Sequence, residues 1–183
     1  YTIGNKLMQK CRICSSNLTK ELINLGKSPI ANSFIPINKK MYSENFMPLK
    51  VLLCDKCGLA QLEEYEKPEN IFNDNYAYFS SFSDSWLSHC KKYVEEMIEL
   101  YNINCDNHVV EIASNDGYML QYFQKKNIKV TGVEPAKNCA DVARNKNIYT
   151  ENIFFTKHNA ASVLKKRGYA DLIIANNVLA HVP

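Results

Sequence analysis

The chain has 183 residues, of which 46% are hydrophobic and 22% are charged, and its formal net charge at pH 7 is +3. This composition is typical of a globular protein and argues against long disordered segments. The small positive excess forms no basic run, and no apolar stretch reaches the roughly 20 residues that span a bilayer, so we expect neither a nucleic acid nor a membrane as partner.

The first part of the chain, residues 1–70, contains short apolar bursts at residues 22–25 and 51–53, separated by glycine and proline. This pattern predicts short strands and loops around a core that is too small to be stable alone. Residues 71–83 are rich in Tyr, Phe and Ser and show neither helical nor strand periodicity.

The second part of the chain, residues 71–183, changes to longer elements. Apolar residues recur every three or four positions from Trp86 to Leu100, which predicts an amphipathic helix with Ser83 or Asp84 as its N-cap. Further along, the pattern predicts strands at 108–112, 129–134 and 171–176 and helices at 117–126, 135–146 and 158–167. Strands that alternate with helices predict an α/β fold with a parallel sheet covered by helices.

Two Cys-x-x-Cys pairs, Cys11 with Cys14 and Cys54 with Cys57, stand 39 residues apart. Two residues between cysteines let a tight turn direct both sulfurs to one point, and two such turns complete a tetrahedral set of four thiolates around zinc. Gly58, directly after the second pair, suits the turn because glycine accepts a positive φ. All four ligands come from the protein, so we predict a structural zinc ion.

The chain has seven cysteines, and an odd number fits poorly with a secreted disulfide framework. We therefore expect a reducing, cytoplasmic setting. The alternatives for the two pairs are unpaired buried thiols or a redox dithiol, although neither pair opens a helix in a thioredoxin-like unit. Cys90, Cys105 and Cys139 have no partner at ligand spacing and are expected to be core residues.

A strand, a turn and a helix follow one another over residues 109–117, and Glu134 ends the next predicted strand. At such a turn, backbone N–H groups face the crevice at the carboxyl ends of the strands, where nucleotide-like ligands bind. A carboxylate at Glu134 can accept hydrogen bonds from both hydroxyls of a ribose. Taken singly, Glu111 can equally be a strand-edge carboxylate without a ligand, and Asp116 a plain helix cap.

The Gly-x-Gly-x-x-Gly motif that seats a pyrophosphate is missing from the sequence. A cofactor with an adenosine and no phosphates therefore fits better than NAD. S-adenosylmethionine is the candidate.

Ordered motifs extend this interpretation over almost the whole chain: Cys11-x-x-Cys14, Ser28-Pro-Ile-Ala-Asn32, Pro48-Leu49, Cys54-x-x-Cys57-Gly-Leu-Ala-Gln61-Leu62, Tyr76-x-Tyr78-x-Ser-Ser81, Glu111-Ile-Ala-Ser-Asn-Asp-Gly117, Gly132-Val-Glu-Pro-Ala136 and Ala175-Asn-Asn-Val-Leu-Ala-His-Val182. With these motifs the chain resembles the deoxysugar C-methyltransferases that act on nucleotide-linked ketosugars. The resemblance implies an N-terminal Cys₄ zinc domain at residues 1–70, a Rossmann-like S-adenosylmethionine domain at residues 71–183, and a third domain that helps enclose the sugar nucleotide.

The resemblance also implies a reaction, in which a methyl group is transferred to the carbon beside a 4-keto group by way of an enolate. Tyr76 and His181 would be the catalytic residues, although in isolation they read as a packing aromatic and a loop histidine. The residues expected to line the cofactor are Glu111, Ala113, Ser114, Asn115, Asp116, Gly117, Glu134, Pro135, Asn176 and Asn177.

Two departures from the family pattern shape the remaining expectations. Ala113 stands where the family usually has glycine, so its methyl group is expected to crowd the cofactor. The chain also stops at Pro183, which leaves the predicted sheet incomplete and the third domain absent. We therefore expect the chain alone to be inactive, and the enzyme to be whole either in its native context or with a partner chain that supplies the missing domain. The alternative is an inactive, zinc-stabilised remnant or split-gene fragment that at most binds cofactor.

Overall fold

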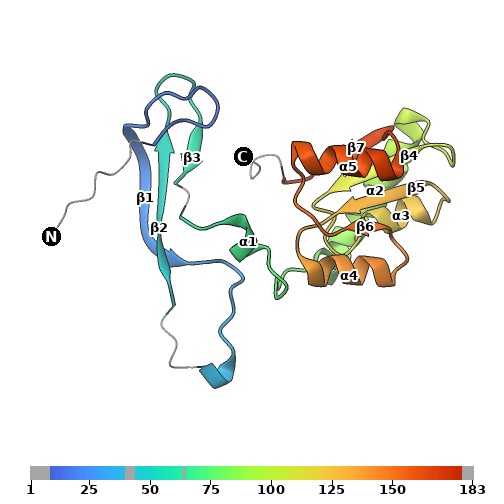
Figure 1. Ribbon diagram of the computed structural model, residues 1–183, viewed down its shortest axis with the longest axis horizontal. Coiled ribbons are helices and arrows are strands. Elements are labelled where there is room, and N and C mark those ends of the chain that lie inside the picture. Colours follow the sequence, from blue (N-terminus) through green and yellow to red (C-terminus); the bar gives the residue numbers. More distant parts are fainter. Residues whose placement is uncertain (1–8, 40–43, 64, 179–183) are drawn as a thin grey trace. The chain divides into compact units, whose positions relative to one another are not determined.

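The computed structural model describes residues 9–39, 44–63 and 65–178 and divides into two compact units, one that ends at Ile71 and one that begins at Phe72 (Figure 1). The smaller unit is built on an antiparallel sheet in the order β1-β2-β3, with β1 at Lys20–Pro29, β2 at Phe46–Leu53 and β3 at Ala60–Leu62. A 3₁₀ turn at Ile37–Lys39 and the short helix α1 at Pro68–Ile71 complete it.

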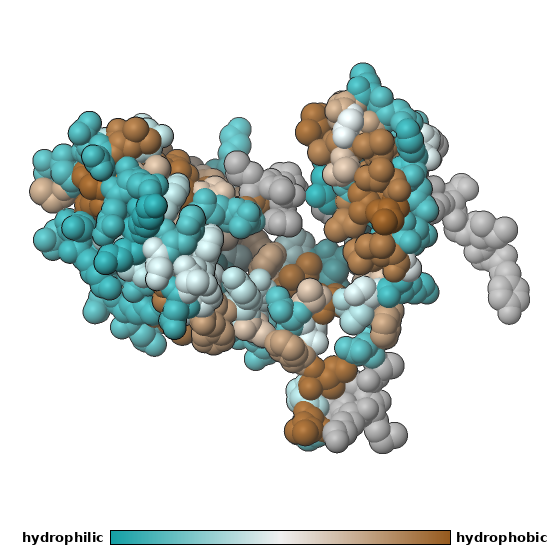
Figure 2. Space-filling view, turned by 180° about the vertical axis from the view of Figure 1, so that it is seen from behind, coloured by the Kyte–Doolittle hydropathy of each residue, from teal (hydrophilic) through white to brown (hydrophobic). Residues whose placement is uncertain are grey.

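The smaller unit has almost no hydrophobic core among its described residues. Leu52 of β2, opposite Gln61 of β3, is its buried aliphatic side chain. Leu22 and Leu25 of β1 are more than half exposed, and Figure 2 shows apolar surface on this unit. The two predicted apolar bursts do form strands, but these strands bury little, so hydrophobic burial alone does not account for their stability.

The larger unit is a parallel sheet covered by helices, as the sequence predicted (Figure 1). Its strands lie in the order β6-β5-β4-β7. The elements in chain order are a 3₁₀ turn at Ser80–Phe82, α2 at Asp84–Tyr101, β4 at His108–Ile112, α3 at Leu120–Gln124, β5 at Lys129–Val133, α4 at Lys137–Asn145, β6 at Thr150–Glu151, α5 at Lys157–Arg167 and β7 at Leu172–Ile174.

Both faces of this sheet are covered, which is why β4 is buried along its whole length. On one face, side chains of α2, α3 and α4 form the main core with alternate residues of the strands, among them Cys90, Val94, Phe123, Val109, Val130 and Ala143. On the other face, Val163 of α5 packs with Val110 and Val133. The expected core role of Cys90 and Cys139 is confirmed, whereas Cys105 is exposed.

The predicted helix start at residue 83 is confirmed, because the Ser83 hydroxyl accepts the N–H of Trp86 at 3.3 Å. The helix predicted at 117–126 is shorter than expected and begins only at Leu120. Asn115 and Gly117 adopt positive φ values of 49° and 76°, which a right-handed helix does not allow. The strands β3 and β6 were not predicted, since three and two residues are too few to show periodicity.

No helix within residues 9–39, 44–63 and 65–178 combines the length and the apolar character that crossing a bilayer requires.

Candidate cofactor site and metal centre

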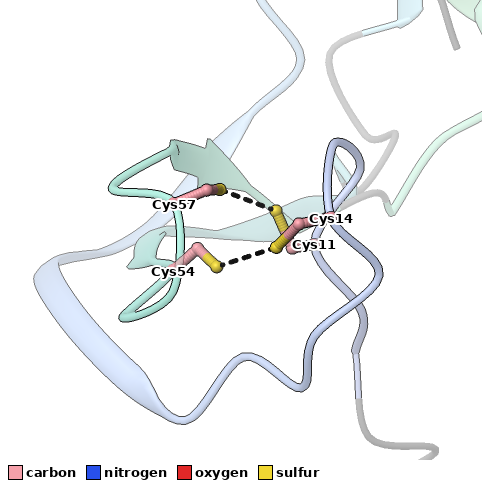
Figure 3. A group of neighbouring side chains, drawn as sticks. All are labelled: Cys11, Cys14, Cys54 and Cys57. Atoms are coloured by element: carbon pink, nitrogen blue, oxygen red, sulfur yellow. Dashed lines mark hydrogen bonds between the residues drawn. The ribbon is translucent and has the colours of Figure 1, made fainter.

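The four cysteines of the two Cys-x-x-Cys pairs converge on one point in the smaller unit (Figure 3). All four Sγ atoms lie within 4.8 Å of one another, and the pairs Cys11–Cys57 and Cys14–Cys54 are each 3.5 Å apart. Four thiolates in a tetrahedron around zinc, at bond lengths of about 2.3 Å, lie about 3.8 Å apart. The residues therefore fit a zinc ion with all four positions filled by protein, as predicted.

Two equivalent turns produce this convergence. The Ser15 N–H donates to the Cys11 carbonyl at 2.9 Å, and the Gly58 N–H donates to the Cys54 carbonyl at 2.8 Å. Ser15 and Gly58 both have positive φ, at 57° and 75°, so the glycine expected at the second turn is used as predicted. Hydrogen bonds, first that of the Cys14 backbone, lower the pKa of Cys11 to about 6. Against the hydrogen bond of the Leu59 backbone, burial and the other three sulfurs raise the pKa of Cys57 to about 12, so the four thiols do not ionise alike.

The turn that follows β4 is held against the end of β5. The Ser114 N–H donates to the Val133 carbonyl at 3.2 Å, and the Asn115 N–H donates to Oε2 of Glu134 at 2.8 Å. Gly132 in β5 makes this approach feasible, because a Cβ at that position would collide with the Ser114 hydroxyl. The structure thus brings together the turn and the carboxylate that the sequence singled out.

Glu134 is only 3% exposed, and each of its carboxylate oxygens already accepts one backbone N–H: Oε2 that of Asn115, and Oε1 that of Ala136 at 2.8 Å. Burial, followed by the charge of Asp116, raises its pKa, while the two N–H groups act in the opposite direction. A carboxylate oxygen has two lone pairs, so each oxygen keeps one for a ligand hydroxyl.

Several buried polar atoms at the end of β4 and in the turn after it have no hydrogen-bond partner. They are both carboxylate oxygens of Glu111, the hydroxyl of Ser114 and Oδ1 of Asp116, and all three residues are at most 2% exposed. Buried polar groups are normally satisfied, and each one that is not costs about 1–3 kcal/mol. Their concentration at one turn points to a polar ligand that completes these bonds.

The Tyr- and Ser-rich segment before α2, residues 71–83, is hydrogen-bonded to the same turn. The side chain of Asn115 accepts the N–H of Ser80 at 2.9 Å and donates to the carbonyl of Tyr78 at 3.1 Å. Asn138 of α4 donates to the Tyr76 carbonyl at 2.7 Å. Asn115, predicted to line the cofactor, therefore uses its side chain to position the segment that carries Tyr76 and Tyr78.

Tyr76 is half-buried close to Glu134. Burial, followed by the negative charge of Glu134, raises the pKa of Tyr76, so its hydroxyl stays protonated and can donate a hydrogen bond. The other predicted catalytic residue, His181, lies outside the described residues.

The carboxyl ends of β5 and β7 carry the remaining predicted residues. Pro135 follows β5, and its carbonyl accepts a hydrogen bond from Asn152 at 2.7 Å. Asn176 follows β7, where its amide lies 3.8 Å from the sulfur of Met119, and Asn177 has a φ of 54° and is exposed. Together with the turn after β4, these residues line up along one edge of the sheet, where α/β folds bind ligands.

Comparison with known families agrees with both centres. Residues 11–72 match a family described as "Putative zinc binding domain", and residues 84–183, more than half of the chain, match the family described as "Methyltransferase domain". The chain belongs to this methyltransferase family. The expected resemblance and the α/β fold class are thereby confirmed, and the Cys₄ cluster of this chain coincides with the zinc-binding match.

A curated relative, the C-methyltransferase NovU of Streptomyces niveus, is 28% identical over 176 residues, which are 96% of this chain and 42% of NovU. The chain therefore spans less than half the length of this relative. Two solved structures align with low TM-scores. The plantazolicin methyltransferase BpumL in complex with SAH aligns with a TM-score of 0.30 and 18% sequence identity, and the alignment covers 52% of this chain and 43% of BpumL. The MccD protein aligns with a TM-score of 0.28 and 17% sequence identity, and the alignment covers 54% of this chain and 34% of MccD.

Sequence reasoning missed some residues that hold the turn after β4 and the end of β5 in place. Lys146, just after α4, reaches the Asp116 carboxylate at 3.4 Å, the Asp116 carbonyl at 2.8 Å and the Ser81 hydroxyl at 3.2 Å. Asn152 binds the carbonyls of Glu134 and Pro135. Asn152 lies directly after β6, at the carboxyl ends of the strands, and a prediction of β6 would have drawn attention to it. Lys146 carries no comparable signal.

Proposed function

We propose that this chain binds S-adenosylmethionine at the carboxyl ends of β4, β5 and β7 and forms the zinc-stabilised methyl-donor part of a C-methyltransferase for nucleotide-linked 4-ketosugars. Membership of the methyltransferase family and the identity with NovU support methyl transfer to carbon. The sugar class rests on the resemblance seen in the sequence motifs.

The observation that carries the proposal is the junction between the turn after β4 and Glu134, where the Asn115 N–H meets the carboxylate at 2.8 Å. The junction puts the free lone pairs of Glu134 beside the unsatisfied oxygens of Asp116 and Glu111. A ligand that spans it would meet acceptors for ribose hydroxyls at one end and carboxyl groups suited to a cation at the other. S-adenosylmethionine carries both kinds of group and no phosphate.

Bound S-adenosylmethionine supplies an electrophilic methyl group on a sulfonium. In the proposed site, Glu134 accepts the ribose hydroxyls, while Ser114, Asn176 and Asn177 line the cofactor. The protonated hydroxyl of Tyr76 donates to the oxygen of the ketosugar as charge develops there. His181 is proposed to remove the proton beside the ketone, since an imidazole titrates near neutral pH.

The zinc-binding unit is proposed to have a structural role. Its metal would have no open position for substrate, so it would stabilise residues 1–70 and take no part in methyl transfer. We retain the division into a zinc-binding domain at residues 1–70 and a cofactor-binding domain at residues 71–183. Metal-bound thiolates fit the reducing cytoplasm, which we propose as the compartment.

Calorimetric titration with S-adenosylmethionine tests the cofactor assignment. We expect one binding event per chain, weakened at least about tenfold in Glu134→Ala by loss of one or two hydrogen bonds to a charged acceptor. Glu151→Ala is the matched control, because Glu151 ends the neighbouring strand β6 but pairs with Lys166 at 2.9 Å. Equal affinity in all three proteins, or no binding to any, would contradict the assignment.

The substrate class is tested separately with the native gene product, S-adenosylmethionine carrying a deuterated methyl group, and a 4-keto nucleotide sugar. Mass spectrometry should find one labelled methyl group on a sugar carbon. A product labelled on oxygen or nitrogen would exclude C-methylation while leaving the cofactor site intact.

A further inference from the structure

Gln61 is a buried polar residue beside the cysteine cluster that the proposed function does not use. It follows the second Cys-x-x-Cys pair on β3, lies opposite Leu52 of β2, and is only 8% exposed. A position this buried usually holds an apolar side chain. An amide there costs free energy unless both of its ends are hydrogen-bonded.

One end of the Gln61 amide has a hydrogen-bond partner and the other has none. The backbone N–H of Arg12, inside the first Cys-x-x-Cys turn, donates to Oε1 of Gln61 at 3.2 Å. Because a backbone N–H can only donate, this contact fixes the orientation of the amide, with its nitrogen on the other side. Nε2 is buried without a hydrogen-bond partner. The group that the Gln61 side chain faces is the thiol of Cys11.

A zinc-bound Cys11 thiolate would make use of such a donor. Four thiolates around one Zn²⁺ leave a net charge of −2, which N–H and O–H groups stabilise by pointing at the sulfurs. The backbone N–H groups of Ile13 and Cys14 already point at the sulfur of Cys11, and the hydroxyl of Ser16 lies 3.3 Å from the sulfur of Cys14. These donors come from the same turn, whereas Gln61 reaches the cluster from the sheet.

We propose that Gln61 is a hydrogen-bond donor to the zinc-bound thiolate of Cys11, with Nε2 donating to Sγ while Oε1 holds the N–H of Arg12. The amide then connects β3 to the first Cys-x-x-Cys turn in a unit that has almost no hydrophobic core among its described residues. The zinc affinity therefore depends on a residue that is not a ligand. This inference concerns the zinc site and does not depend on the methyl-transfer reaction.

The experiment is competition for zinc between a chromophoric chelator and the 183-residue chain, unmodified and as Gln61→Glu. The glutamate keeps an oxygen for the N–H of Arg12 but replaces the donor with a second oxygen, which repels the thiolate. We expect it to bind zinc about 10–100-fold more weakly, as is typical when a group that hydrogen-bonds to a metal ligand is lost.

The matched control is Asn24→Asp in the same unit. It makes the same change from amide to carboxylate on the exposed surface and keeps the oxygen that accepts the N–H of Gly26 at 2.9 Å. This variant should bind zinc as tightly as the unmodified chain.

A second variant, Gln61→Leu, removes the donor without burying a charge, and Co²⁺ in place of zinc provides its spectroscopic readout. A hydrogen bond to a thiolate stabilises the sulfur lone pairs and raises the energy of the sulfur-to-cobalt charge-transfer band. We expect this band at lower energy in Gln61→Leu than in the unmodified chain. The d–d bands of tetrahedral cobalt verify that all four cysteines still bind the metal.

Each outcome decides for or against the donor role. Unchanged zinc affinity in Gln61→Glu would overturn it, because the contact with Arg12 would then suffice, and so would an unshifted cobalt band in Gln61→Leu. Loss of all metal binding in both variants would mean that the cluster cannot form without Gln61, which also contradicts a graded contribution. An unmodified chain that binds no zinc would remove the metal site together with this inference and leave the cofactor site standing.

Discussion

The two units of the chain are stabilised by different means. In the part of the smaller unit that the structure describes, the buried hydrophobic residues are Cys11, Leu52 and Cys54, so two of three are proposed metal ligands. The larger unit buries aliphatic and aromatic side chains on both faces of its sheet, including Leu120 and Phe123. Stability should therefore depend on metal binding in the first unit and on packing in the second.

The two units also differ in that the proposed ligand site lies in the larger one. Four buried polar atoms without partners belong to Glu111 at the end of β4 and to Ser114 and Asp116 in the turn after it, inside the well-packed unit, where unsatisfied groups are costly. A rigid sheet tolerates such a cost because its core supplies ample free energy.

The largest expected effect comes from removing the metal. A chelator, or the substitution Cys54→Ser, should unfold residues 9–71, because structural zinc contributes about 10–16 kcal/mol in zinc-finger peptides. Amide hydrogen exchange should show loss of protection in this unit and none in β4 and β5. Cys105→Ser is the control, since Cys105 is exposed and outside the cluster. Loss of protection in both units would show that they are not stabilised independently.

A steric test addresses the packing of the larger unit. Gly117→Ala should destabilise it by about 2–4 kcal/mol, from the strain of a left-handed backbone plus overpacking. Gly117 has a φ of 76°, and an added Cβ would lie 2.5 Å from Cδ1 of Ile148. Denaturation followed by the single tryptophan, Trp86, measures this unit.

The matched variant for this test lies in the smaller unit. Gly26 of β1 has a φ of 80° but no atom within 4 Å of an added Cβ. Gly26→Ala should leave the Trp86 transition unchanged. A shift of that transition in Gly26→Ala as large as in Gly117→Ala would contradict a separate core.

The connection between the turn and the Tyr76 segment can be broken with Asn115→Ala. Loss of the two hydrogen bonds to Tyr78 and Ser80 should cost about 1–3 kcal/mol and speed amide exchange over residues 76–81. Asn147→Ala controls for backbone conformation, since Asn147 has a φ of 60° and is exposed. Unchanged exchange over residues 76–81 in Asn115→Ala would show that its side chain does not position the segment.

Replacing Ala113 should have a smaller effect, and it should raise the stability of the larger unit where the preceding substitutions lower stability. Its φ of 54° is unfavourable for alanine, so Ala113→Gly should stabilise the larger unit by up to about 1 kcal/mol. Ala161→Gly in α5 should instead destabilise it by about 1 kcal/mol, because glycine is a poor helix former. A destabilised Ala113→Gly protein would mean that the methyl group contributes packing that outweighs the strain.

The smallest effect is the pH dependence from His108, at the opposite end of β4 from the proposed site. Its ring is buried between the Tyr169 carbonyl and the Thr131 hydroxyl, and burial lowers its pKa from 6.5. The unfolded chain therefore binds a proton that the folded chain resists, so stability should fall as the pH drops below about 6.5. The Trp86 transition of His108→Gln should lose this part of the pH dependence.

Features coded by neighbouring residues could be predicted from the sequence. The Cys-x-x-Cys spacing predicted the cluster, the hydroxyl of Ser83 predicted the start of α2, and the apolar run at β4 predicted a buried strand. Features that depend on contacts distant in sequence could not be predicted. The side chain of Asn115 binds residues 35 and 37 positions away, and Lys146 binds Asp116 across 30 positions. No local sequence pattern indicates such distant partners.

The most direct test of the central claim is amide hydrogen exchange of the zinc-loaded chain with and without S-adenosylmethionine. The proposed site predicts slower exchange at residues 113–117 and 134–136, which the ligand would bridge, and no change in residues 9–71. Protection confined to the zinc-binding unit, or unchanged exchange at both segments under saturating ligand, would contradict a cofactor site at the carboxyl ends of β4 and β5.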